Sequence, residues 1–191
     1  MIKLLFVIAL NLVAATTFAA IAEDGAYSLD KDHANVGFSV THLGISNTVG
    51  RFNTMSGDFN LVSGGDSTVT FSIETDSIDT NQKRRDKHLK SNDFFNVKKF
   101  KTIDFKSTAV TYSEEGDPLT ITGDMTMLGE TKSVTFDVTP VGAGNGPAGD
   151  TRAGYSVKTV VLRSDFGLGQ KFNGVVGDEV TVDVQIEIIK K

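Results

Sequence analysis

Hydrophobic and polar residues alternate with a period of two along most of the chain. Val69, Phe71 and Ile73 alternate with threonine, serine and glutamate, the same pattern recurs in residues 133–139, and it is longest in residues 180–188. Strict alternation predicts β-strands with one buried and one solvated face. The β-branched and aromatic content of these stretches agrees with that prediction.

Short turn sequences separate the alternating stretches. Ser63-Gly64-Gly65-Asp66 and Leu128-Gly129-Glu130 are two of them, and connections this short join antiparallel neighbours. We therefore predict an all-β protein of eight antiparallel strands. The expected strands lie near residues 34–43, 55–63, 67–75, 101–113, 118–128, 132–141, 153–164 and 178–190.

Alternation alone does not separate a β-sandwich from a β-barrel. The expected strands are long, at about nine to thirteen residues, which favours a barrel. The chain has no cysteine and no tryptophan, so the Cys–Trp–Cys pattern of immunoglobulin sandwiches is absent. An eight-stranded barrel is just wide enough for packed side chains or one slender ligand.

Residues 80–96 interrupt the strand pattern with a polar segment rich in lysine and arginine. Asp79 or Thr80 could cap a helix at its start, and Ser91-Asn92-Asp93 could cap a second turn. We expect a helical insertion there, within a crossover of about 25 residues. Connections of that length are unusual in a small β domain and are often functional.

The N-terminus has the layout of a secretory signal peptide. Lys3 supplies a positive start, an apolar run extends from Leu4 to Val13, and Ala20-Ile21-Ala22 offers a cleavage site. The run is too short to span a bilayer as a helix; an N-terminal membrane anchor is the alternative. We expect residues 1–22 to be a cleaved signal peptide, residues 23–191 to form one domain, and the periplasm to be its location.

Composition excludes several classes of function. Without cysteine there is no disulfide, thiolate metal site, cysteine nucleophile or lipid-modified cysteine. A formal net charge of −5 argues against binding to nucleic acid and against stable association with an anionic membrane.

Sequence motifs of catalysis are also missing. The chain contains no Gly-x-Ser-x-Gly elbow, no His-Glu-x-x-His helix and no phosphate-binding glycine loop. Residues 142–150 hold several glycines but lie between strands, so we expect a flexible loop there. We therefore expect no enzymatic activity and no cofactor.

The apolar interior is the largest candidate site. Of the 13 phenylalanines, 11 follow the predicted signal; some fall on inward strand faces and others, Phe172 among them, near strand ends where a barrel would open. Ordinary core packing is the alternative explanation. Gly37, Gly57 and Gly123 bracket the inward faces and could leave room for a ligand. The residues that we predict to line a cavity are Phe38, Val40, His42, Phe52, Phe59, Phe71, Ile73, Phe94, Phe105, Met125, Phe136, Val157, Phe166 and Val182.

A basic segment on an acidic chain is the second candidate. Residues 83–101 contain eight Lys or Arg and two Asp, a net charge of +6. Charge-assisted hydrogen bonds from such a segment could hold the head group of a ligand; a solvated helix is the alternative. The head-group candidates are Arg84, Arg85, Lys87 and His88.

Histidine spacing argues against a metal site. His33 and His42 point to opposite faces if their strand is unbroken, so they cannot share a metal ion, and we expect none. Structural, hydrogen-bonded histidines are the simpler reading. Arg163 and Asp30 are among the charged residues that could pair to fix loops against the barrel.

Several strings resemble the YceI-like family of exported polyisoprenoid-binding proteins. The most specific is Arg85-Asp86-x-His88-Leu89-x-Ser91-x-Asp93-Phe94-Phe95. Shorter matches in the same order cover nearly all of residues 27–188. They are Asp32-His33, Val36-x-Phe38-x-Val40-x-His42-Leu43, Gly50-x-Phe52, Ser77-Ile78-Asp79-Thr80, Ile103-x-Phe105-x-Ser107, Arg163-x-Asp165-Phe166-Gly167 and Gly177-Asp178-Glu179-Val180.

The resemblance implies a lipocalin-like antiparallel barrel of eight strands with a helical insertion, usually paired as a homodimer. It also implies that a polyisoprenoid, a quinone-like molecule or a fatty lipid lies along the apolar interior of a non-catalytic, periplasmic binding protein. Two alternatives remain: a barrel with a solid core that acts through its surface in interactions or a stress response, and an enzyme that modifies a bound lipid. The amount of free space inside the barrel distinguishes the lipid-binding protein from the barrel with a solid core.

Overall fold

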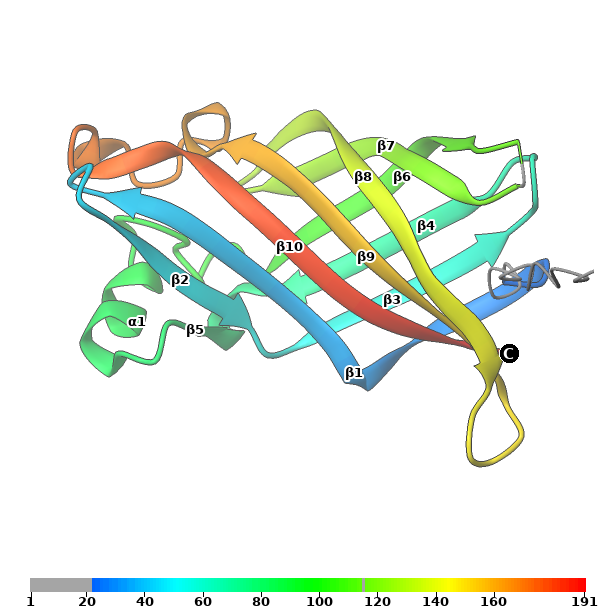
Figure 1. Cartoon of the computed structure of the whole chain (residues 1–191). Helices are drawn as coiled ribbons and strands as arrows, with labels where there is room; N and C mark the ends of the chain where they lie inside the picture. The colour runs from blue at the N-terminus through cyan, green and yellow to red at the C-terminus, as the bar shows by residue number, and fades with distance from the viewer. Residues whose placement is uncertain (1–21, 115) are drawn as a thin grey trace, which may run out of the picture.

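The computed structural model describes residues 22–114 and 116–191, and these form a twisted β-barrel with a helical insertion at one end (Figure 1). The helical elements described are α1 (Lys83–Leu89) and the short 3₁₀ turns η1 (Thr75–Ser77), η2 (Arg163–Phe166) and η3 (Gln170–Phe172). The strands are β1 (Gly25–His42), β2 (Ser46–Phe52), β3 (Met55–Leu61), β4 (Thr68–Glu74), β5 (Ile78–Asp79), β6 (Thr102–Tyr112), β7 (Pro118–Met127), β8 (Glu130–Asn145), β9 (Thr151–Leu162) and β10 (Val176–Lys190).

The predicted signal peptide, residues 1–22, lies outside the described residues except for Ala22, which is buried. Within the described part of the chain, no helix combines the length and the hydropathy that crossing a membrane requires.

Eight strands close into a barrel. They run in the order β10-β9-β8-β7-β6-β4-β3-β1, and a further pairing of β1 with β10 completes the ring. The pairings are antiparallel, as hairpin connections require. The predicted eight-stranded antiparallel barrel with a helical insertion is therefore confirmed.

Strand β1 is long enough to serve two neighbours on one side. Residues 25–28 pair with β3, and residues 36–42 pair with β2. Between these stretches the register with β10 shifts, since Asp30 faces Glu187 whereas Asn35 faces Gln185. This bulge bends the strand, and His33 lies within it, so the alternation that would place His33 opposite His42 is interrupted.

Two strands were not predicted, and two boundaries were wrong. Residues 46–51 of β2 are mostly polar or glycine and β5 has two residues, so neither carries a clear alternation signal. The first predicted strand begins at Gly25 rather than at residue 34. The predicted loop at 142–150 is shorter, because residues 142–145 extend β8 and pair with β9.

The insertion contains one short helix, α1. Its N-cap is Gln82, whose side chain accepts a hydrogen bond from the Arg85 amide, so the predicted caps Asp79 and Thr80 were wrong. After the helix, residues 92–95 form the predicted second turn, and the Asp93 amide donates to Ser91 Oγ at 3.3 Å. The Ser91 hydroxyl itself donates to the His88 carbonyl oxygen at 2.7 Å.

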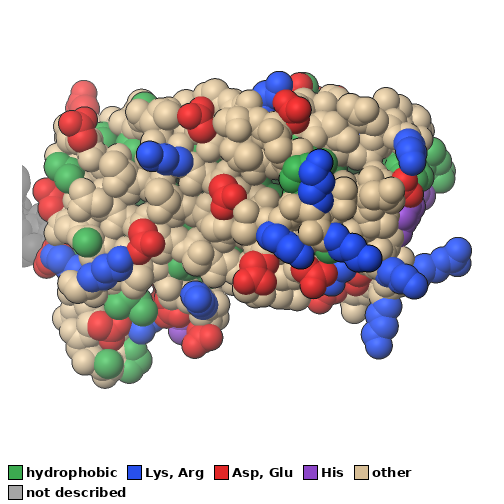
Figure 2. Space-filling model, turned by 180° about the vertical axis from the view of Figure 1, so that it is seen from behind, with side chains coloured by type: hydrophobic (Ala, Val, Ile, Leu, Met, Phe, Trp, Pro, Cys, Tyr) green, Lys and Arg blue, Asp and Glu red, His purple; other side chains and the backbone are tan. Residues whose placement is uncertain are grey.

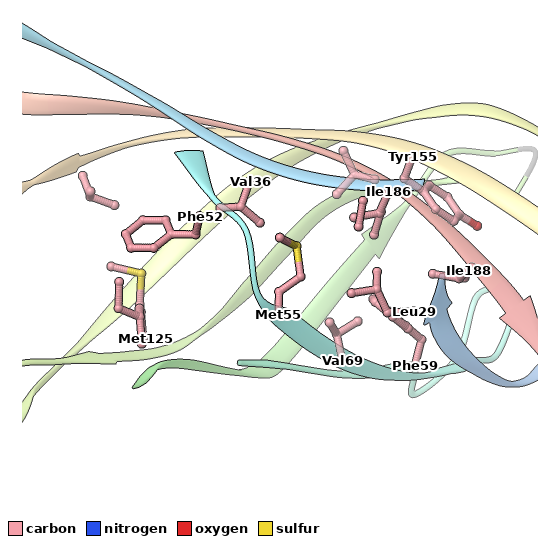
Figure 3. Close-up of a cluster of buried hydrophobic side chains, with 14 of the residues drawn as sticks. Leu29, Val36, Phe52, Met55, Phe59, Val69, Met125, Tyr155, Ile186 and Ile188 are labelled. Carbon is pink, nitrogen blue, oxygen red and sulfur yellow. The ribbon is translucent and has the colours of Figure 1, made fainter. Parts of the chain in front are cut away.

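One half of the barrel is a packed core. Tyr27 and Ile188 have no exposed surface, and Leu29, Met55 and Tyr155 are each at most 8% exposed. Figure 3 shows Leu29, Met55, Tyr155 and Ile188 pointing toward one another between the strands. Burial raises the pKa of the Tyr155 hydroxyl. This end of the barrel is filled, and any ligand space must lie in the other half.

Candidate functional site

The other half of the barrel is hollow. A cavity of about 430 Å³ extends inside it, within the range of about 300–1,000 Å³ typical of ligand pockets. Free space of this size disfavours the solid-core alternative. The predicted cavity residues that line it are Phe38, Val40, His42, Phe52, Phe59, Phe71, Ile73, Phe94, Phe105, Met125, Phe136, Val157 and Val182.

Phe166 does not line the cavity. It lies in η2, just after β9, and is 2% exposed. Its ring belongs to the buried hydrophobic core, because the chain leaves the sheet at this turn and the strand alternation no longer sets the direction of the side chain.

Some residues that line the cavity were not predicted from the sequence. Val180, Val184 and Ile186 share the alternating face of Val182 on β10, so the same pattern could have identified them. Other wall residues carried no such signal, since they lie in turns or in the insertion. These include Leu89, Leu168 and Val175, whereas Phe172, expected near the opening, does line the cavity.

Two wall phenylalanines lie across from glycines of the neighbouring strand. Phe38 pairs with Gly50, and a Cβ added at Gly50 would stand 2.4 Å from the tip of the Phe38 ring. Phe71 pairs with Gly57 in the same way. Because the rings extend sideways over backbone that lacks side chains, they cover the wall and leave the lumen open.

The glycine prediction therefore needs correction. Gly57 and Gly123 accommodate phenyl rings and do not themselves leave space for a ligand, since an added Cβ would meet Phe71 at 2.8 Å and Phe105 at 2.6 Å. Gly37, by contrast, lines the cavity as predicted, although a Cβ added there would lie 3.3 Å from the Asp183 carbonyl oxygen.

The cavity opens at the end that carries α1. Several of its lining residues are themselves exposed there, including Thr41, His42, His88 and Val175. Leu43, at the β1–β2 turn, donates its amide to the Val175 carbonyl oxygen at 2.7 Å. The turn and the segment before β10 thus lie side by side at this opening, which we call the mouth.

Aromatic rings join the insertion to the segment before β10. Phe94 and Phe172 stack, and the His88 ring meets both edge-on, with centroids 5.1 and 5.2 Å away. Lys171 Nζ lies 2.8 Å from Asp93 Oδ1, and His88 Nε2 lies 3.3 Å from Asp93 Oδ2. The hydrogen bond from Lys171, with a smaller contribution from His88, lowers the pKa of the Asp93 carboxyl.

The predicted head-group residues separate into two pairs. Arg85 and His88 line the cavity, whereas Arg84 and Lys87 are exposed and are not among its lining residues. Arg85 also braces the insertion, because its Nε and Nη2 donate to the hydroxyl and carbonyl oxygens of buried Thr80 at 2.7 and 2.8 Å.

The neighbouring carboxylate completes this brace. Asp86 Oδ1 accepts from the Thr80 amide at 2.9 Å and from the Thr80 hydroxyl at 2.5 Å. The Arg-Asp pair therefore fixes the start of α1 against the barrel, and Arg85 contacts the cavity as well.

Arg163 shapes the other side of the mouth. It is 3% exposed and donates to the carbonyl oxygens of Leu168, Gly169, Val176 and Gly177 and to Asn173 Oδ1, at 2.8 to 3.1 Å. The sequence suggested a carboxylate partner, but carbonyl oxygens of one curled segment surround the guanidinium instead. Arg163 thus holds residues 168–177 in the shape that forms the rim.

A cluster of charged residues lies at the β1 bulge. Asp30, His33 and Glu187 offer ligand atoms within 4.8 Å of one another, although we expected no metal site. Arg152 Nη1 lies 2.5 Å from Asp30 Oδ2 and 3.2 Å from Glu187 Oε2. The Arg152 guanidinium is therefore already paired with both carboxylates, and we interpret the cluster as an ion-pair network that fixes the bulge.

Comparison with known sequences gives consistent matches along nearly the whole chain. The sequence profile of the family described as YceI-like domain matches residues 27–188. A UPF0312 protein of Vibrio campbellii is 39% identical over 188 residues, covering 97% of this chain and 96% of that protein. A UPF0312 protein of Shewanella denitrificans is 42% identical over 161 residues, or 83% of each chain.

Solved structures share the barrel. The YCEI protein of Campylobacter jejuni, 28% identical, superposes with a TM-score of 0.70 over 85% of this chain and 96% of its own. Burkholderia cenocepacia BcnA, 22% identical, has a TM-score of 0.71 over 83% of this chain and 98% of its own. A polyisoprenoid binding domain from Saccharophagus degradans, 12% identical, has a TM-score of 0.68 over 86% and 98%.

Proposed function

The chain belongs to the YceI-like family, and from this premise we propose that it is a non-catalytic binding protein that holds one long-chain lipid in the hollow half of its barrel. The lipid class that we propose is a polyisoprenoid, a quinone with a long side chain, or a fatty lipid. The apolar cavity, filled at one end and open at the other, is the observation that carries this proposal.

The shape of the cavity favours a slender ligand. On β10 its wall extends from Val176 to Ile186, a distance of about 34 Å along the strand and about 25 Å along the axis of a typically tilted barrel. A compact ligand would leave much of this length empty. A single extended hydrocarbon chain would fill it.

The energetics are compatible with a carrier. A chain that buries about 400 Å² of apolar surface gains about 10 kcal/mol at 25 cal/mol per Å². This gain exceeds the lower estimates of the cost of immobilising a ligand, about 4 kcal/mol. The head group would stay at the mouth, near His88 and the part of Arg85 that borders the cavity.

One comparison supports the ligand class, and the N-terminal sequence supports the location. The Saccharophagus degradans domain, which has the same fold, is described as polyisoprenoid binding. The N-terminal sequence has the layout of a signal peptide, so we propose that the protein works in the periplasm. We further propose that it is a homodimer.

Mass spectrometry of the purified protein tests the proposal. We would express the full chain, purify the protein without detergent, extract it with organic solvent and identify lipids in the extract. Native mass spectrometry in parallel would give the number of lipids and of chains in each complex. We expect about one lipid per chain. A protein that is empty and takes up neither added polyprenyl lipids, quinones nor fatty acids would refute the carrier function.

A further inference from the structure

The turn between β1 and β2 exposes large apolar side chains. Leu43 is 52% exposed and Ile45 is 83% exposed, and neighbouring Val175 is 39% exposed. Leu43 also has a φ of 55°, in the left-handed region that leucine rarely adopts and that glycine or asparagine occupies at low cost. A strained position that retains an exposed leucine points to a use for that side chain.

These apolar side chains lie at the mouth of the cavity. The Leu43 amide is bonded to the Val175 carbonyl oxygen, and Val175 together with His42, the residue before Leu43, lines the cavity. A surface that contacts this apolar rim is therefore adjacent to the route by which a ligand enters.

Helix α1 adds positive charge at the same end. Lys83, Arg84 and Lys87 are exposed, and among the described residues they form no ion pair. Figure 2 shows Lys and Arg side chains projecting from the end of the molecule that carries α1, at the lower right of that view. Arg85 and His88 of the same helix line the cavity, so α1 and the apolar turn border one opening.

The acidic residues of this segment do not cancel its positive charge. Asp93 is paired with Lys171, and Asp86, which accepts two hydrogen bonds from Thr80, keeps its negative charge. The four Lys and Arg residues of α1 against this one Asp leave the helix with a net charge of +3. This local field differs from the net charge of −5 for the whole chain, which does not describe what a partner would meet at the mouth.

We propose that the mouth end docks reversibly on an anionic lipid bilayer. Leu43, Ile45 and Val175 enter the interfacial region while the side chains of α1 face lipid phosphate groups, which is the pattern of an interfacial contact that does not span the membrane. A lipid could then pass between bilayer and cavity without crossing water. Docking on a bilayer adds a partner surface to the proposed carrier function. Only the purpose of docking, the transfer of a lipid into the cavity, rests on that proposed function.

Vesicle flotation tests the docking directly. The purified protein is mixed with vesicles of 30% phosphatidylglycerol and 70% phosphatidylcholine, or of phosphatidylcholine alone, at low and high salt. We expect flotation with the anionic vesicles, less with the neutral ones, and a loss at high salt because screening shortens the reach of the charges. Equal binding to both vesicle types would overturn the electrostatic part of the proposal.

A charge-reversal variant tests the contribution of α1. Lys83→Glu/Arg84→Glu/Lys87→Glu should weaken partition by at least about tenfold, since each basic residue near an anionic surface strengthens binding by about fivefold. The matched control is Lys31→Glu/Lys106→Glu/Lys132→Glu, which changes the net charge equally at exposed positions outside the insertion. An equal loss in both variants would show that only net charge matters.

A second pair of variants tests the apolar rim. Leu43→Asn/Ile45→Ser removes the exposed side chains and suits the left-handed backbone at position 43, so folding should be unaffected. Its control is Val141→Ser, at a side chain that is 71% exposed on β8. We expect the double variant to lose vesicle binding and to retain lipid uptake from solution, with the control unchanged.

The outcomes separate this proposal from the carrier function. A protein that takes up lipid in solution but ignores anionic vesicles overturns docking alone. A protein that floats with vesicles but never takes up lipid overturns the carrier function alone. If Leu43→Asn/Ile45→Ser changes the oligomeric state without vesicles, then the rim is covered by a second copy of the chain and the docking proposal is wrong.

Discussion

The rings of Phe94 and Phe172 stack face to face, with centroids 4.8 Å apart and ring planes inclined by 13°. Phe94 follows α1 and Phe172 lies in η3, so this contact ties the helical insertion to the segment before β10. Both residues line the cavity. The stack is therefore part of the mouth, where the proposed ligand would pass beside it.

Removing one ring should speed ligand release. An aromatic pair contributes about 0.5–1.5 kcal/mol beyond its buried area, so Phe172→Ala should raise the release rate of a bound lipid about 2- to 10-fold. Stopped-flow transfer of a fluorescent fatty acid to acceptor vesicles measures this rate. Phe100→Ala is the control, since Phe100 lies under Lys99 and does not line the cavity. Equal rates in both variants would argue against a gating role for the stack.

Filling the lumen should abolish uptake. Val182 lines the cavity from β10, whereas Val160 on β9 is 55% exposed and is not among the lining residues. Val182→Trp should weaken lipid binding at least about tenfold because the indole occupies ligand space, and Val160→Trp should leave it unchanged. Isothermal titration with a soluble short-chain prenyl lipid compares the two. Binding that survives in Val182→Trp would place the ligand elsewhere.

Arg163 should be costly to replace. Arg163→Met leaves several carbonyl oxygens of residues 168–177 without a donor, and such changes destabilise by about 3–5 kcal/mol. Urea unfolding followed by circular dichroism measures the free energy. Lys171→Met, at a nearby exposed side chain, should cost no more than about 1 kcal/mol. If Arg163→Met lowers the free energy of unfolding by less than about 1 kcal/mol, then water replaces the guanidinium as the donor to these carbonyl oxygens.

The glycines beneath phenyl rings should tolerate no side chain. A Cβ at Gly123 would lie 2.4 Å from the Lys106 carbonyl oxygen and 2.6 Å from the Phe105 ring. Gly123→Ala should therefore destabilise by about 1–3 kcal/mol through overpacking. Gly142→Ala is the matched control, because a Cβ there meets nothing within 4 Å. Thermal unfolding of the two variants side by side decides the matter.

The ion cluster at the β1 bulge predicts a dependence of stability on pH. The hydrogen bond from His33 lowers the pKa of the Asp30 carboxyl, and the same bond raises the pKa of His33. A lowered carboxyl pKa stabilises above the unfolded value of about 3.9, and that contribution is lost as the pH falls through the folded value. A raised histidine pKa stabilises fully below about 6.5, and that contribution is lost as the pH rises through the folded value.

The two effects together give greatest stabilisation by the cluster between about pH 4 and 6.5. Asp30→Asn should flatten this dependence, and Asp32→Asn, at an exposed neighbour, should not. Urea midpoints at pH 3, 5.5 and 8 provide the measurement. If Asp30→Asn and the wild type show parallel curves, the cluster does not control the pH dependence.

The alternation along the sequence predicted the barrel and much of its wall. Residues such as Val182 and Phe71 lie on inward faces because side-chain direction along a strand has a fixed period. Strand β2 escaped prediction because residues 46–51 offer few apolar side chains to set a pattern. Residues 142–145 of β8 were predicted to be a loop because glycine and other small residues are typical of loops.

The open lumen and the mouth could not be read from the sequence. Whether Phe38 fills the interior depends on its register with Gly50, and register is a property of the closed sheet. The surroundings of Arg163 depend on how residues 168–177 curl, and the stack of Phe94 on Phe172 depends on two segments meeting across the mouth. The stack joins residues far apart in the sequence, and the Arg163 contacts depend on the path of a whole loop, so residue type at one position gives no signal for either.

The cavity can form only after β1 has paired with β10, because this pairing closes the barrel. These are the first and last strands described, and they pair along most of their length. A ribosome makes β1 long before β10, so this edge stays unpaired until β10 has been made. A chain that still lacks β10 has no enclosed space, so we expect that any lipid enters only after the barrel has closed.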